Sequence, residues 1–234
     1  MHSAYVCNVV IDLEFTTVPK DRRVGGLVHE IIEVGAVKLS PDGTVVGEFS
    51  HLVRPTMAGG VCGVVRKMTG IRTADVACAR RLEEVLAALS AWVGPGRARF
   101  VTWSEADRNQ IRRECAAKGI SVPLPSRWLD IQRLYPRLMG QASKRKVALG
   151  EAADWCGIAN SRTSAHRALY DAQMTAELFR MMAAGDCAEQ HARVEAELAR
   201  AQERSSCSSS IADRCGGLAD LLAQLSAQDA PRAA

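Results

Sequence analysis

Two carboxylates follow an apolar run near the N-terminus, in the stretch VVIDLEFTT at residues 9–17. Asp12 and Glu14 lie two positions apart, and the run before them is typical of a buried strand. Because side chains alternate along a strand, both carboxylates belong to one face. Two buried like charges are unfavourable together, and a divalent cation relieves this because Mg²⁺ and Mn²⁺ take oxygen ligands. The alternative is a strand that ends at Asp12, with both groups in solvent, which is the commoner case for an isolated D-x-E pattern.

Two further acids and a histidine occur at related places. Asp107 opens a predicted helix directly after the apolar stretch RFVTWS, and Asp171 follows His166 by five residues. Each has an ordinary interpretation alone: Asp107 as an acid that complements the helix dipole, Asp171 and His166 as surface residues. The combination of a D-x-E strand, an Asp after a later strand and H-x-x-x-x-D at a helix start is far rarer by chance.

The elements that must position these groups begin as strands and later alternate with helices. Apolar runs predict strands at residues 5–14, 30–40, 45–55, 98–104 and 127–131. The second and third flank the turn PDGT at residues 41–44, so they form an antiparallel hairpin. Helical periodicity predicts helices at residues 73–94, 105–120, 148–158 and 164–185. This order predicts an α/β fold, a mixed sheet with helices packed on its faces.

The composition changes after Gly185, which predicts a catalytic-type domain over residues 1–185 and a helical, serine-rich C-terminal tail over residues 186–234. The tail contains a flexible break at residues 205–210. Beyond it, four leucines share one helical face: Leu218, Leu221, Leu222 and Leu225. A short isolated helix is marginal in water, so this stripe should pack on its own domain, on a protein partner or on a second copy.

The net charge, the apolar runs and the cysteines limit the classes of protein to which the chain can belong. The 234 residues carry a net charge of +4, which permits an anionic partner without requiring one. No run of 18 apolar residues or secretory signal is present, so no membrane span is expected. Eight cysteines are scattered without a C-x-x-C pair, which favours free thiols and a cytoplasmic protein.

The acids and histidine, together with several blocks around them, carry a family resemblance. VHEIIEVGAVKL, LVRP, KMTGI, RWLDIQRLY and HRALYDAQMTAELF occur in the order seen in the DnaQ-like, DEDD-type 3′→5′ exonucleases whose third motif is H-x-x-x-x-D. The resemblance covers about residues 5–185 and is closest to the branch of KapD-like proteins and Eri-type exoribonucleases. It implies a ribonuclease H-like mixed five-stranded sheet flanked by helices.

The resemblance also implies roles for individual residues. Asp12 resembles the carboxylate that bridges two metal ions, and Glu14 and Asp171 resemble ligands of the metal that holds the attacking water. Asp107 resembles the acid that serves the second metal, and His166 resembles the general base.

The third motif departs from the family pattern. The family usually has Gly, and often an aromatic residue, just before its acid, whereas here the stretch is TWSEAD, with Ser104 and Ala106 at those places. Glu105 offers a competing carboxylate. Asp107 is preferred because DRNQIRREC continues the family pattern of an Asp that opens a helix.

The function expected from the resemblance is hydrolysis of nucleic acid from a free 3′ end to nucleoside 5′-monophosphates, with two Mg²⁺ ions for which Mn²⁺ can substitute. Single-stranded RNA is favoured because of the Eri-type branch. Phe15 and Thr16 are expected to contact the terminal nucleotide. A basic cluster of Lys144, Arg145 and Lys146 either contacts phosphates or is a solvated loop.

Two other functions compete with this expectation. One is a DNA exonuclease, such as a proofreading subunit whose tail binds a polymerase. The other is a nucleic-acid-binding regulator without turnover. The complete set of four acids and a histidine disfavours the regulator, because a binding module needs no general base.

Overall fold

A computed structural model describes residues 7–121, 124–138, 146–158 and 166–186, with Ala192, Ala196 and Arg200 beyond them. The chain divides into two compact units, Met1–Gln190 and His191–Ala234. The basic residues Lys144 and Arg145 and the leucine stripe at residues 218–225 lie outside the described residues. Among the described residues, no helix combines the length and apolar character that a membrane span requires. The five described cysteines are free thiols: Cys7, Cys62, Cys78, Cys115 and Cys156.

The predicted mixed sheet is confirmed. Its five strands are β1 (Cys7–Thr17), β2 (His29–Leu39), β3 (Val45–Leu52), β4 (Ala98–Thr102) and β5 (Trp128–Asp130). Their order across the sheet is β3-β2-β1-β4-β5. The first three strands pair antiparallel, and β4 and β5 continue the sheet parallel to β1.

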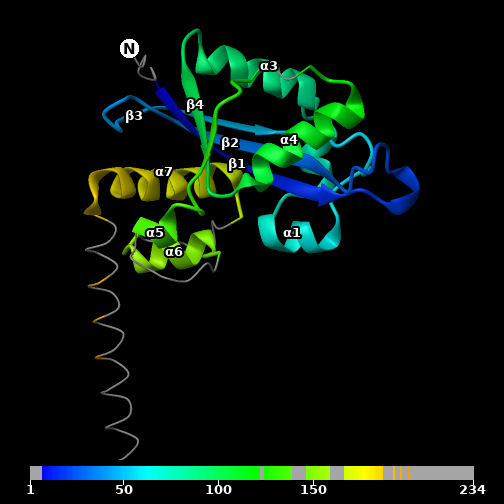
Figure 1. The fold of residues 1–234 in the computed structure, drawn as a ribbon. Coiled ribbons are helices and arrows are strands. Elements are labelled where there is room, and N and C mark those ends of the chain that lie inside the picture. The colour runs from blue at the N-terminus through cyan, green and yellow to red at the C-terminus, as the bar shows by residue number, and fades with distance from the viewer. Residues whose placement is uncertain are drawn as a thin grey trace, which may run out of the picture. The chain divides into compact units, whose positions relative to one another are not determined.

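Helices cover both faces of the sheet (Figure 1). They are α1 (Gly63–Thr69), α2 (Thr73–Ala77), α3 (Leu82–Val93), α4 (Glu105–Lys118), α5 (Tyr135–Leu138), α6 (Leu149–Trp155) and α7 (Ala168–Ala184), with a 3₁₀ turn at Lys20–Arg22. One apolar cluster packs α3 and α4 against the side of β1 that carries Val9 and Ile11. A second packs α5, α6 and α7 against the side that carries Val10. The central strand β1 is therefore enclosed between two cores.

Two predicted boundaries are corrected. The first strand continues past both acids to Thr17, where it still pairs with β2, instead of ending at Glu14. The helix predicted over residues 73–94 is two helices, because Arg80 forms a β-bridge with Val53 and Glu84 accepts a hydrogen bond from the Arg81 N–H at the start of α3. This break was not predicted, because the apolar residues on both sides of it follow helical periodicity.

Candidate active site

The strand β1 carries Asp12 and Glu14 beyond the point where β4 leaves it. The last β4 pairing of β1 is Val10 with Val101, whereas the pairing with β2 continues to Thr17. Asp12 and Glu14 share a face with Val10, which packs against residues of α7, and the intervening residues belong to the opposite core. The two carboxylates therefore lie on a continuous strand beneath the start of α7, and the interpretation of a strand that ends at Asp12 is excluded.

Gly35 lets the start of α7 approach the sheet. It pairs with Asp12 across the β1–β2 ladder. A Cβ at Gly35 would lie 2.1 Å from the carbonyl carbon of Ala168 and 2.1 Å from the backbone nitrogen of Leu169, closer than any real contact. The first turn of α7 thus rests directly on β2, and Asp171 follows within that turn.

His166 and Asp171 are brought together with Glu14. The backbone N–H of His166 donates to Oδ2 of Asp171 over 3.2 Å, and His166 adopts φ 65°, which is uncommon for a residue other than glycine. Glu14, His166 and Asp171 can each offer one ligand atom, and these atoms all lie within 4.8 Å of one another. Residues more than 150 positions apart in the sequence therefore share one potential metal site.

Asp107 joins the group from the opposite side of the sheet, at the first turn of α4. Ser104 caps this helix by accepting from the Ala106 N–H. The side chain of Asp107 is buried, whereas Glu105 is exposed. The charge of Asp107 acts on Asp12, while the charge of Glu105 acts on Asp130. The geometry thus favours Asp107 over Glu105 as the acid of this motif.

The pKa values of the four acids at the site are raised. Burial is the main cause for Asp12, whose pKa is raised well above its ordinary value, and the charges of Asp107, Asp171 and Glu14 add to it. Burial and the Asp171 charge raise the pKa of Glu14 to about 8. Burial also raises the pKa of Asp107 to about 7, and it raises that of Asp171. These groups resist being ionised together, which is the condition that a hard divalent cation relieves.

Glu33 is a further residue of this region that the sequence analysis did not single out. It is buried and accepts three hydrogen bonds from the guanidinium of Arg167, the shortest being 2.6 Å, and one of 3.0 Å from the Ala168 N–H. Glu33 therefore fixes the segment directly after His166. An acid between apolar residues in EIIEVGAV was the available signal, because a carboxylate buried in a strand needs a partner.

Two of the residues predicted to contact substrate, Phe15 and Thr16, make contacts within the fold. The Thr16 hydroxyl donates to the Gly60 carbonyl over 3.2 Å and accepts from the Cys62 N–H over 3.0 Å, so it already ties β1 to the loop before α1. Phe15 is half-buried against the core that contains α3 and α4. Lys146 is exposed. The roles of Phe15, Thr16 and Lys146 in substrate binding stay predictions.

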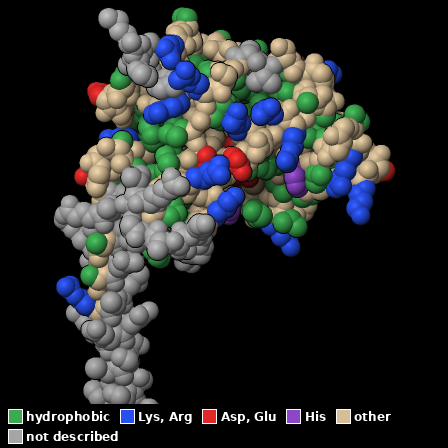
Figure 2. Space-filling model, viewed as in Figure 1, with side chains coloured by type: hydrophobic (Ala, Val, Ile, Leu, Met, Phe, Trp, Pro, Cys, Tyr) green, Lys and Arg blue, Asp and Glu red, His purple; other side chains and the backbone are tan. Residues whose placement is uncertain are grey.

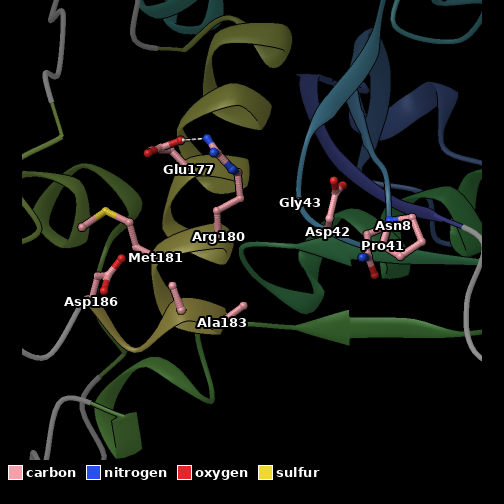
Figure 3. A pocket seen from close by; sticks show the side chains of 10 residues that line it. Asn8, Pro41, Asp42, Gly43, Glu177, Arg180, Met181, Ala183 and Asp186 are labelled. Atoms are coloured by element: carbon pink, nitrogen blue, oxygen red, sulfur yellow. Dashed lines mark hydrogen bonds and ion pairs between the residues drawn. The ribbon is translucent and has the colours of Figure 1, made fainter.

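The surface around the acids is mixed in charge. Figure 2 shows a small group of acidic side chains near the middle of one face, with Lys and Arg side chains around it. A separate cavity of about 380 Å³ lies between the β2–β3 turn and the end of α7 (Figure 3). Its lining includes Asn8, Asp42 and Arg180, and Arg180 pairs with Glu177 over 2.7 Å. None of the predicted site residues lines this cavity.

Known proteins resemble the chain over most of its length. The RNase_T family model, described as exonuclease, matches residues 9–179. The DNA polymerase III subunit epsilon of Aquifex aeolicus (strain VF5) is 29% identical over 173 residues, which cover 73% of this chain and 77% of that protein. The fold is similar to the nuclease domain of 3′hExo, a DEDDh family member bound to rAMP, with a TM-score of 0.67, 22% identity, and 80% of this chain and 96% of that one covered.

A second solved structure, exonuclease X in complex with 5′ overhanging duplex DNA, is 26% identical with a TM-score of 0.51, and the match covers 80% of this chain and 98% of that one. The family match spans far more than half of the chain. The chain therefore belongs to the RNase_T exonuclease family.

Proposed function

We propose that this exonuclease removes nucleotides stepwise from the 3′ end of single-stranded RNA in the cytoplasm, with two Mg²⁺ ions and His166 as general base. The observation that carries the mechanism is the convergence of Asp12, Glu14, Asp107 and Asp171 with His166 in one partly buried group. Exonucleases of this family use divalent metal ions, and a set of carboxylate oxygens suits Mg²⁺, with Mn²⁺ able to substitute.

The carboxylates divide the work of holding the ions. The charges of Asp107, Asp171 and Glu14 all act on Asp12, so Asp12 is the group suited to face both ions. Glu14 and Asp171 would hold the first ion and Asp107 the second. The ions, when bound, stabilise the attacking and leaving oxygens of the phosphodiester.

His166 acts on the proton of the attacking water. Its side chain is exposed at the start of α7, beside Glu14 and Asp171, so it can reach both solvent and the scissile phosphate. Neutral imidazole accepts a proton near neutral pH, because its ordinary pKa is about 6.5. The backbone N–H of His166 donates to Asp171 and lowers the pKa of that ligand, against the effect of burial.

The choice of RNA rests on resemblance. The sequence blocks are closest to the Eri-type branch, and a structure similar in fold shows 3′-end specific recognition of histone mRNA stem-loop by a 3′-exonuclease. The DNA alternative has support of its own, because the 29% identical relative is a DNA polymerase subunit. A proofreading-type DNA exonuclease, whose tail at residues 186–234 binds a polymerase, is therefore the second candidate function.

One experiment separates these functions. Matched RNA and DNA oligonucleotides, labelled at either end, are incubated with the full chain in Mg²⁺ or EDTA. We expect mononucleotide release from the 3′ end, faster for RNA and absent in EDTA. Faster digestion of DNA would favour the proofreading-type enzyme. Binding without hydrolysis in Mg²⁺ and in Mn²⁺ would favour a regulator, and internal cleavage products would contradict an exonuclease.

A further inference from the structure

The helix α4 carries a basic outer face that the chemistry described above does not use. Its buried residues follow helical spacing and face the sheet: Asp107, Gln110, Ile111, Glu114 and Cys115. The opposite side carries Arg108, Arg112 and Arg113, of which the last two are exposed. Glu105 is the one acid on that side of α4, so the outer face has three positive charges and one negative charge.

Among the residues that the structure describes, these arginines form no ion pair, and the ion pairs there involve other basic groups, such as Arg72, Lys118, Arg167 and Arg180. Guanidinium groups gathered on one helix face repel one another, and a polyanion relieves that repulsion. Figure 2 shows Lys and Arg side chains over the part of the molecule where Figure 1 places α4.

The helix itself is held rigidly on the sheet. Gln110 donates to the His29 carbonyl over 2.6 Å, and Glu114 accepts from the Ile31 N–H over 2.8 Å. Near the end of the helix, Lys118 bridges Glu114 and Glu30. These contacts of the inner face therefore fix which side of α4 faces outward. The backbone positions of the arginines are thereby set relative to the site.

The basic face starts at the site and leads away from it. Arg108 directly follows Asp107, and Arg112 lies one helical turn, about 6 Å, further along the axis. Beside the last turn, the β1–β2 loop lies close to α4, since a Cβ at Gly25 would contact Ala117 at 3.6 Å. That loop exposes Lys20 and Arg22 together with the acidic Asp21, and the Arg22 guanidinium lies beside Gly59. The basic face next to the acids is therefore formed by α4 itself, through Arg108, Arg112 and Arg113.

We propose that the outer face of α4 binds the phosphodiester backbone of the substrate strand upstream of the nucleotide being removed. This inference rests on the proposed function, because only a substrate longer than the reacting nucleotides reaches Arg112 and Arg113. The helix contains no aromatic residue on which bases could stack. The contact is therefore electrostatic, independent of base sequence, and sensitive to salt.

The test compares the salt dependence of binding. A double variant, Arg112→Gln with Arg113→Gln, removes two charges and keeps good helix formers. Binding of a long, fluorescently labelled single strand of mixed sequence is measured in EDTA at several salt concentrations. We expect the slope of log K against log salt to become shallower by about 0.7 for each lost phosphate contact, and so by about 1.4 for the pair.

Two controls define the result. Arg112→Lys with Arg113→Lys keeps both charges and should retain the wild-type slope. Arg180→Gln removes one charge from the outer side of α7, where Arg180 is paired with Glu177, and should also retain it. A wild-type slope in the double glutamine variant, with its folding verified by circular dichroism, would overturn the proposal.

A second readout uses substrate length. In Mg²⁺, the ratio of kcat/KM for the long strand to kcat/KM for a dinucleotide should fall in the double glutamine variant, because the dinucleotide cannot reach Arg112 and Arg113. An unchanged ratio would contradict the proposal. If the wild-type enzyme hydrolyses neither substrate, the proposed function fails, while the binding series in EDTA still decides whether α4 holds the strand.

Discussion

The β1–β2 ribbon carries buried carboxylates in two opposite kinds of surroundings. Glu30 is fully buried, and its oxygens accept hydrogen bonds from the backbone N–H groups of Thr56, Met57 and Ala58 and pair with Lys118 over 2.6 Å. Burial tends to raise the pKa of Glu30, but the hydrogen bonds from Lys118 and the backbone outweigh it, so the pKa is lowered. The fold itself supplies every partner that this charge needs.

Asp12 lies on the neighbouring strand under the opposite conditions. Burial raises its pKa, and the charges of Asp107, Asp171, Glu14 and Glu33 raise it further. Among the described residues, no ion pair or hydrogen bond to its carboxylate offsets these effects. Burial alone therefore does not identify a functional acid. A buried acid with its own donors supports the fold, whereas a partly buried acid surrounded by other acids is suited to a cation from outside.

The largest expected effect is the loss of turnover when the Asp12 carboxylate is removed. Asp12→Asn should lower turnover by about three decades or more, because it removes the carboxylate placed between both proposed ions. In EDTA the same variant should unfold at an equal or higher temperature than the wild type, since one member of a repelling cluster has been removed. Hydrolysis assays and thermal unfolding measure the two effects. A variant with near-normal turnover, or one that is destabilised in EDTA, would contradict this assignment.

The next effect concerns His166. His166→Ala should lower kcat by about two or more decades, the scale of general-base catalysis, while the affinity for a single strand changes little. The wild-type rate should also fall as the pH drops and the imidazole becomes protonated, and the residual rate of the variant should lose that dependence. Steady-state kinetics over a pH series provide the measurement. Retention of the wild-type pH profile by the variant would place the base elsewhere.

A smaller effect is the loss of stability when the charge of Glu30 is removed. Glu30→Gln should lower the free energy of unfolding by about 2–3 kcal/mol, because the charge facing Lys118 is lost and the amide nitrogen of Gln cannot accept the hydrogen bonds that one carboxylate oxygen accepts from the loop at residues 56–58. Glu177→Gln is the matched control, since it breaks an exposed pair with Arg180 and should cost less than about 1 kcal/mol. Urea unfolding measures both. Equal stability losses in the two variants would show that the buried donors do not distinguish Glu30.

A further effect is the pH dependence of stability without metal. The pKa values of Glu14 and Asp107 are raised to about 8 and about 7, so the folded protein retains protons that the unfolded chain releases near pH 4. The free energy of unfolding in EDTA should therefore fall as pH rises from about 4 to about 8. Mg²⁺ should counteract the fall by displacing these protons. Unfolding curves at several pH values test this, and a stability that rises with pH over this range would contradict the assigned directions.

The sequence predicted the fold better than the breaks within its helices, and the acids and the histidine that it proposed for the site lie close together. Alternating side chains placed Asp12 and Glu14 on one face, and the H-x-x-x-x-D spacing placed His166 and Asp171 at one helix start. The break between α2 and α3 was missed, because Arg80 leaves the helical path to pair with Val53, a contact with a distant segment. Periodicity within a segment carries no information about such a partner.

From the sequence one can read which chemical groups are present, which of them share a strand face or a helix turn, and which family they resemble. Only the packing of distant segments buries Asp107 and leaves Glu105 exposed. It also decided that the start of α7 rests on Gly35 and that Glu33 holds Arg167, a residue 134 positions later. Short-range rules follow from backbone geometry and can be read along the chain. The burial and mutual charges that raise the pKa of Asp12 arise only when distant segments pack together, and so only the folded chain contains them.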